Sequence, residues 1–164
     1  TSVHEIENSL AVLKYPMKLI LIRHGESARN RGYEVLGEEN NLTAVGVKQA
    51  IEVGAELAPK KISAIYCSQT PRCEQTMDEI LRIRDDSFPI HFSRLVGPKM
   101  KSENYEKLKA RVELFLDDLK YDHNEEDIVV VVSHQMVISM ALFLIEGKQE
   151  KLANGEIREI MFGN

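Results

Sequence analysis

The stretch "LILIRHGESARN" (residues 19–30) joins a short apolar run to a polar continuation rich in arginine. The run from Leu19 to Ile22 has the length and unbroken apolar character of a strand buried on both faces of a sheet. It stops at Arg23 and His24, and Gly25 follows directly. A buried strand that ends in reactive side chains suits chemistry better than packing, so the rest of the chain must supply the partners of these residues.

Strand and helix patterns alternate along the rest of the chain. Such an order predicts an α/β fold, a three-layer α/β/α sandwich with a mostly parallel central sheet whose last strand lies at an edge. The expected strands are 18–22, 63–68, 89–92, 127–134 and 155–162, and the expected helices are 42–57, 71–83, 102–119 and 136–147.

The helix over 42–57 shows the pattern most clearly. Thr43 is its expected N-cap, and Val45, Ala50, Val53 and Leu57 recur at helical spacing, as on a face that packs against a core.

Residues 1–16 precede the segment that starts "MKLILIRHG". Ser2 and Glu5 fit a capping box, and the apolar spacing behind them predicts a short amphipathic helix. We interpret it as an extension that packs on the domain, with a partner-binding helix or the remnant of an upstream module as alternatives. Residues 17–164 are then expected to form one domain, a size that supports its own core.

Composition limits the classes of partner. The net charge is −5 and the pI is near 5.6, which disfavours a general nucleic-acid or membrane surface but allows a local basic pocket. Cys67 and Cys73 are the only cysteines, a usage typical of a reduced, cytoplasmic protein, and their spacing is poor for zinc. No apolar run approaches the roughly 20 residues of a membrane span, and no signal peptide is visible.

Three of the expected strands lead to reactive residues. The first ends at Arg23 and His24, the second leads to Arg72 at the start of a helix, and the strand 127–134 ends at His134. Taken singly, such a histidine is more often structural and such an arginine is usually a solvated charge. Ligands of these sheets bind at the carboxyl ends of the strands, so we expect the four residues to converge there. The remaining histidines are interpreted as structural or surface residues: His4, His91 and His123.

The chemistry of this set fits phosphate. Forked guanidinium donors of Arg23 and Arg72 match phosphate oxygens, and the helix start at Arg72 also favours an anion. One neutral imidazole can attack phosphorus, and a second, if protonated, can stabilise the developing charge. Gly25 allows close approach of the backbone, and Asn30 can donate another hydrogen bond. Together they predict phosphoryl transfer through a phosphohistidine, with no metal and no cofactor required.

Two other phosphoryl-transfer sites are excluded by spacing. A cysteine phosphatase loop needs five residues between its cysteine and arginine, and only four separate Cys67 from Arg72. No glycine-rich loop ending in GK[ST] is present, which excludes a P-loop kinase.

The same segments resemble the histidine phosphatase superfamily, the phosphoglycerate mutase-like group. "LIRHGESARN" is similar to the RHG box with its trailing asparagine, and "NLTAVGVKQA" resembles the LTxxGxxQA segment. "YCSQTPRCEQT" resembles the S-x-x-x-R-x-x-Q-T segment, "SENYEKLKARVELFLDDL" the helix that leads into the next strand, and "VVVVSHQMVI" the strand with the second catalytic histidine. The resemblance implies a phosphoglycerate mutase-like fold and a nucleophile at His24. It also implies a phosphate pocket, with these members in falling order of support: Arg23, Arg72 and His134, then Asn30, then Ser27.

One departure concerns the general acid. Longer members of the family carry a glutamate in an L-x-E pattern, but "RLVGPKM" has Leu95, Val96 and Gly97 there, and the segment is short. Gln135 after His134 also excludes the His-Asp pair of the acid phosphatase branch. Glu26 is the better substitute acid because it lies close to His24, and Glu103 is the other candidate, although a glutamate in the first turn of a helix has an ordinary structural explanation.

An enzyme without a dedicated acid should cleave alkyl phosphates poorly, because leaving-group protonation typically contributes 10²–10⁴-fold. Phosphohistidine needs less help, and the compact layout resembles the SixA-type phosphohistidine phosphatases. The expected substrate is a phosphorylated protein or a small phosphorylated metabolite with a good leaving group. A broad phosphomonoesterase and a non-catalytic phosphate-binding domain remain alternatives, and a mutase is the least favoured.

Overall fold

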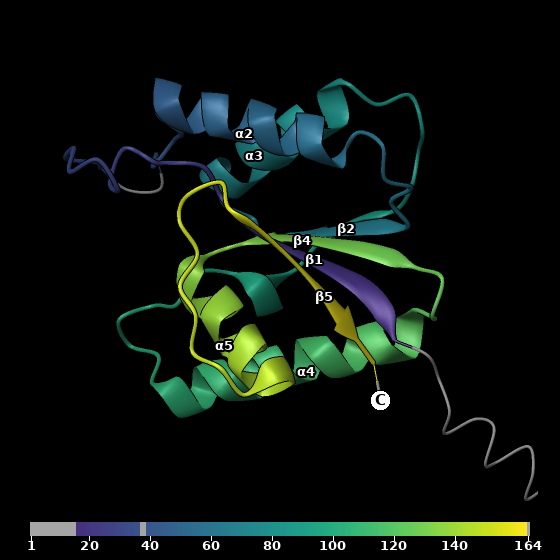
Figure 1. Ribbon diagram of the computed structural model, residues 1–164. Helices are drawn as coiled ribbons and strands as arrows, with labels where there is room; N and C mark the ends of the chain where they lie inside the picture. Colours follow the sequence, from purple (N-terminus) through teal and green to yellow (C-terminus); the bar gives the residue numbers. More distant parts are fainter. Residues whose placement is uncertain (1–15, 37–38, 164) are drawn as a thin grey trace, which may run out of the picture.

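A computed structural model describes residues 16–36 and 39–163. Its central sheet has the strand order β3-β2-β4-β1-β5, in which only β5 runs antiparallel to its neighbour (Figure 1). The strands are β1 (Met17–Arg23), β2 (Ala64–Cys67), β3 (Ile90–Phe92), β4 (Ile128–Ser133) and β5 (Ile157–Phe162). The mostly parallel sheet with β5 at an edge is thus confirmed. The expected N-terminal helix lies outside the described residues, and the division into an extension and one domain stays a prediction.

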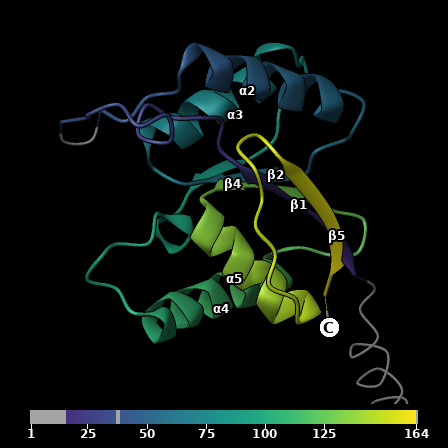
Figure 2. The same cartoon turned by 60° about the vertical axis from the view of Figure 1, so that its left-hand side comes forward.

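Helices cover both faces of this sheet, as Figures 1 and 2 show. On one face lie α2 (Ala44–Leu57) and α3 (Pro71–Arg82), and on the other lie α4 (Tyr105–Asp122) and α5 (Gln135–Glu146). A short 3₁₀ helix, η1 (Arg94–Val96), precedes α4. The three-layer α/β/α sandwich is therefore confirmed. In the part of the chain that the structure describes, no helix combines the length and apolar character needed to cross a membrane.

Each face of the sheet has its own apolar core, because strand side chains alternate between the faces. In β1, Leu19 and Leu21 pack with α4 and α5, whereas Ile20 and Ile22 pack with α2 and α3. All four are almost completely buried. The residues from Leu19 to Ile22 are all apolar, without alternating polar residues, because neither face of β1 is exposed to solvent.

Two details differ from the sequence-based expectation. Val45 lies outside the core with 42% of its surface exposed, because Gly46 and not Val45 faces the rest of the protein at the start of α2. Helix α4 begins at Tyr105 and not near residue 102, because the Asn104 side chain accepts a hydrogen bond from the Lys107 amide and caps the helix there.

The start of α2 lies directly against the loop that follows β1. Thr43 caps the helix as expected, with its hydroxyl accepting from the Gly46 amide. A Cβ on Gly46 would overlap the Glu26 carbonyl group, and a Cβ on Gly25 would overlap the Gly46 carbonyl oxygen. Backbone therefore contacts backbone at this point, and glycine is required on both sides.

This contact predicts the effect of Gly46→Ala. Alanine is the better helix former by about 1 kcal/mol, which by itself would stabilise α2. The added methyl group meets backbone that cannot rotate away, so we expect the free energy of unfolding to fall by about 1–3 kcal/mol. Urea denaturation of the two proteins measures the difference.

Lys48→Ala is the matched control, since Lys48 lies on the exposed side of the same helix. Its effect should stay within about 0.5 kcal/mol. A Gly46→Ala protein as stable as the wild type would contradict the close contact.

Candidate active site

The carboxyl ends of β1, β2 and β4 lie side by side, as the predicted convergence requires. Arg23 and Ser133 are register partners at the ends of β1 and β4, and the His24 amide donates to the Ser133 carbonyl at 3.1 Å. The His24 and His134 rings meet edge to face with their centroids 5.2 Å apart. The structure thus brings together two histidines that are 110 positions apart in the sequence.

His24 is buried and carries its lone pair on a defined nitrogen. Its Nδ1 lies 2.7 Å from the Gly25 carbonyl oxygen. Because a carbonyl can only accept, Nδ1 must hold the proton, and Nε2 is left with the lone pair of a nucleophile. Burial, and to a smaller extent the charges of Arg72 and Arg23, lower the pKa of His24 to about 4. The imidazole is therefore neutral at neutral pH.

His134 has the opposite tautomer. Its Nδ1 faces Arg72 Nη2 at 3.3 Å, and since a guanidinium only donates, Nδ1 accepts. Its Nε2 lies 2.8 Å from the Ser68 hydroxyl. Burial lowers the pKa of His134 to about 2, and the charge of Arg72 adds to this effect. Negative charge placed beside the His134 ring would instead raise the pKa of the ring, because it would stabilise the protonated form.

Two partly buried arginines add positive charge to the site. Arg72 lies in the first turn of α3, next to His134. Arg23 donates from Nη1 to the Leu152 carbonyl at 2.8 Å, but its Nε is buried and has no hydrogen-bond partner among the described residues. An unpaired buried donor is costly, and a phosphate oxygen is the kind of acceptor that would satisfy it.

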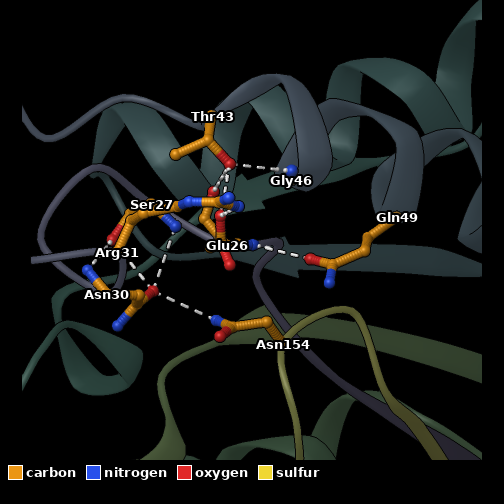
Figure 3. Close-up of polar contacts among 8 residues, drawn as sticks. All are labelled: Glu26, Ser27, Asn30, Arg31, Thr43, Gly46, Gln49 and Asn154. Carbon is orange, nitrogen blue, oxygen red and sulfur yellow. Dashed lines mark hydrogen bonds and ion pairs between the residues drawn. The ribbon is translucent and has the colours of Figure 1, made fainter.

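Residues of the two neighbouring helices hold the loop that carries Gly25 and Glu26. The Gly25 amide donates to the Thr76 hydroxyl at 3.1 Å. The Glu26 amide donates to the Gln49 side chain at 2.8 Å, a bond drawn in Figure 3. Gln75 accepts from the Leu42 amide at 2.8 Å. The loop is therefore fixed from both α2 and α3.

Asn30 lies beside this loop, and the oxygen of its side-chain amide accepts hydrogen bonds. Its Oδ1 accepts from the amide and the hydroxyl of Ser27, at 3.0 and 2.9 Å, and from Asn154 Nδ2 at 3.1 Å (Figure 3). Ser27 is thus placed as a partner of Asn30. Its hydroxyl faces the asparagine side chain.

The two carboxylates considered as general acids are both paired. Glu26 accepts from the Thr43 hydroxyl at 2.8 Å and from Arg31 at 3.1 Å, and these bonds lower its pKa (Figure 3). Glu103 receives two bonds from Arg111, at 2.6 and 3.0 Å, which likewise lower its pKa. Both groups are held in the ionised form, which disfavours proton donation and weighs against the expectation that Glu26 supplies the acid.

Other histidines lie apart from this cluster. His91 is exposed and stacks on Tyr66, and His123 lies between Tyr66 and Asp127. This agrees with their interpretation as structural or surface residues, and His4 lies outside the described residues.

Several residues of the site were not singled out in the sequence. Four of them occupy defined positions of the family segments quoted above: Gln49, Ser68, Gln75 and Thr76. The segments mark these positions, but they do not indicate which backbone or side-chain groups the residues bind. Asn154 lies in the loop between α5 and β5 and carried no signal in the sequence. Within the described ranges no three His, Cys, Asp or Glu side chains form a group that could hold a metal ion.

Solved structures with the same fold include proteins of different activity. A phosphoglycerate mutase from Bacillus anthracis aligns with a TM-score of 0.80 and 14% identity, over 93% of this chain and 91% of that one. The protein histidine phosphatase SixA, complexed with tungstate, aligns with a TM-score of 0.70 and 18% identity, over 87% and 86% of the two chains. At these identities the likeness establishes a shared fold, the phosphoglycerate mutase-like one.

The sequence comparisons establish the family. A probable phosphatase of Schizosaccharomyces pombe is 33% identical over 85 residues, which is 51% of this chain and only 40% of that protein. The model of the histidine phosphatase superfamily (branch 1) matches residues 19–95 and 87–160, which include all the residues of the cluster described above. The chain belongs to the histidine phosphatase superfamily, branch 1.

Proposed function

We propose that the protein is a phosphatase that transfers a phosphoryl group from its substrate to His24 and then to water. In the first step a bond forms between His24 Nε2 and phosphorus while the bond to the leaving group breaks and its electron pair departs with that group. In the second step the oxygen of a water molecule forms a bond to phosphorus while the bond from Nε2 breaks. The electron pair returns to Nε2, which restores neutral His24, and the water proton leaves with the phosphate or passes to solvent.

The observation that carries the proposal is the His24 tautomer. The bond from Nδ1 to the Gly25 carbonyl leaves the lone pair on Nε2, and burial keeps the ring neutral. The guanidinium groups of Arg23, whose Nε has no partner in the part of the chain that the structure describes, and of Arg72 supply positive charge for the phosphate oxygens. We assign His134 to the same oxygens, since a bound phosphate dianion raises the pKa of a neighbouring imidazole.

We propose further that no side chain protonates the leaving group. Glu26 and Glu103 are both paired and ionised. The second ring nitrogen of a phosphohistidine can take a proton from water, because an imidazole nitrogen ordinarily has a pKa near 6.5. The ring then departs as neutral imidazole when the N–P bond breaks, whereas an alkyl phosphate must release a strongly basic alkoxide. Phosphohistidine, or another phosphate with a good leaving group, is therefore the proposed substrate class.

A substrate panel tests this function. We expect a histidine-phosphorylated protein to be hydrolysed at least about 10²-fold faster than glycerol phosphate, with p-nitrophenyl phosphate between them, because only the alkoxide needs an acid. His24→Ala should abolish all three activities. Phosphate release under single-turnover conditions is the measurement.

His91→Ala is the matched control, because His91 is exposed on β3 and lies apart from the cluster. It should keep the wild-type rates. Equal turnover of the alkyl and histidine phosphates would point instead to a hidden acid and a broad phosphomonoesterase, and oxyanion binding without turnover would identify a non-catalytic binding domain.

The protonation of His24 gives a second prediction. Because burial lowers its pKa to about 4, the ring should stay neutral, with hydrogen on Nδ1, from pH 8 down to about pH 5. Long-range ¹H–¹⁵N NMR spectra of the imidazole measure tautomer and titration together. Titration near the ordinary value of about 6.5 would contradict the proposed electrostatics.

The variant Glu26→Gln distinguishes a general acid from a residue that only binds Thr43 and Arg31. If Glu26 only binds Thr43 and Arg31, its loss should slow aryl and alkyl phosphates by the same factor, of less than about tenfold, and leave the shape of the pH profile unchanged. Steady-state rates on the two esters between pH 4 and 9 are compared. A loss of more than about 10²-fold confined to the alkyl ester would instead identify Glu26 as the acid.

A small-molecule substrate is the second candidate, and one observation favours it. A cavity of about 470 Å³ lies next to the loop of Glu26, lined in part by Arg31, Tyr33 and Thr43. Its volume is within the range of small-ligand sites, and its lining does not include His24, Arg72 or His134, so a metabolite there would contact the loop and not the histidines. The B. anthracis relative in fold is a phosphoglycerate mutase, named for a metabolite of this kind.

A further inference from the structure

The orientation of the Asn30 side-chain amide is fixed by hydrogen-bond donors from Ser27 and Asn154. The Ser27 backbone amide can only donate, so the Asn30 atom 3.0 Å from it must be the oxygen. The Ser27 hydroxyl and Asn154 Nδ2 approach the same oxygen, at 2.9 and 3.1 Å. The nitrogen of the Asn30 amide therefore lies at the other end of the group, and it makes no hydrogen bond within the described part of the chain.

Asn154 is oriented by the same logic. Its Nδ2 lies 3.2 Å from the His24 carbonyl oxygen, which can only accept, so the nitrogen must face that way. One amide nitrogen therefore bridges the backbone of His24 and the side chain of Asn30 (Figure 3 shows the bond to Asn30).

The loop that carries Asn154 is itself fastened to the end of β1. The Gly155 amide lies 3.0 Å from the Arg23 carbonyl and 3.1 Å from the His24 carbonyl, and the Arg23 amide donates to the Glu156 carbonyl at 3.2 Å. Gly155 has φ of +71°, a conformation that glycine adopts without strain. The position of Asn154 is therefore tied to the position of His24.

We propose that Asn154 is a positioning residue that fixes the Asn30 amide relative to His24, with its nitrogen available to a phosphate oxygen. The inference rests on the proposed function for the statement that phosphate binds beside His24. It adds that the loop between α5 and β5 acts on the bound oxyanion through Asn30, without touching it. Asn154 has no other hydrogen-bond partners within the described ranges.

A double-mutant cycle tests the coupling, with tungstate as the probe of oxyanion binding. Asn154→Ala should weaken tungstate binding about three- to tenfold, because Asn30 keeps its two bonds to Ser27 but loses the one that fixes its amide relative to His24. In the Asn30→Ala background the same change should cost less than about twofold. Isothermal titration calorimetry of the four proteins gives the dissociation constants, and the same pattern is expected in KM, with a smaller change in kcat.

Lys151→Ala is the matched control, because Lys151 is exposed on the same loop and makes none of these bonds. It should bind tungstate as the wild type does. An equal loss from Asn154→Ala with and without Asn30 would overturn the proposal, since Asn154 would then act only on the His24 backbone.

A second measurement needs no variant. In the wild-type protein, tungstate should shift the NMR signals of the Asn30 side-chain NH₂ group, and unshifted signals would overturn the proposal. Binding does not require turnover, so coupling without hydrolysis would refute the proposed phosphatase and leave this inference standing. A wild-type chain that does not bind tungstate at all would refute the phosphate pocket and this inference together.

Discussion

The site depends on a backbone-to-backbone contact between the loop after β1 and the first turn of α2. Gly25 and Gly46 allow the two segments to meet without side chains between them. The amides of this loop donate to the neighbouring helices, Gly25 to the Thr76 hydroxyl of α3 and Glu26 to the Gln49 side chain of α2. The Gly25 carbonyl, which assigns the His24 tautomer, belongs to the same held loop. The contact between two glycines thus holds the loop whose carbonyl group assigns the proton of His24 to Nδ1.

The electrostatics of the site favour negative charge over positive charge. Two arginines and two histidines share a small buried region, and burial together with mutual repulsion keeps both imidazoles uncharged. The buried Nε of Arg23 has no acceptor within the described residues. In the function proposed above, a phosphate dianion would accept from Arg23 and would stabilise positive charge on His134. The same arrangement that disfavours further positive charge would therefore favour an oxyanion.

The fold could be predicted almost entirely from the sequence, and the site only in part. Apolar runs such as the one from Leu19 to Ile22 and the order of strands and helices are local signals, and the carboxyl ends of parallel strands must meet at one edge. Convergence of His24 and His134 follows from these facts. Asn154 could not be found this way, because its role depends on how a loop with no periodicity folds back onto β1.

The carboxylates illustrate the other limit of sequence reasoning. Glu26 stands two positions after His24, and proximity in sequence made it the better candidate for an acid. Hydrogen bonds from Thr43 and Arg31 lower the pKa of Glu26. Arg31 lies in an irregular loop, and no periodic sequence pattern predicts the path of that loop. The same residue that seemed placed for proton transfer instead joins the loop to the N-terminus of α2. If the proposed function holds and no side chain donates this proton, the site would select its substrate by the leaving group, since the step that an acid would assist must then be easy in the substrate itself.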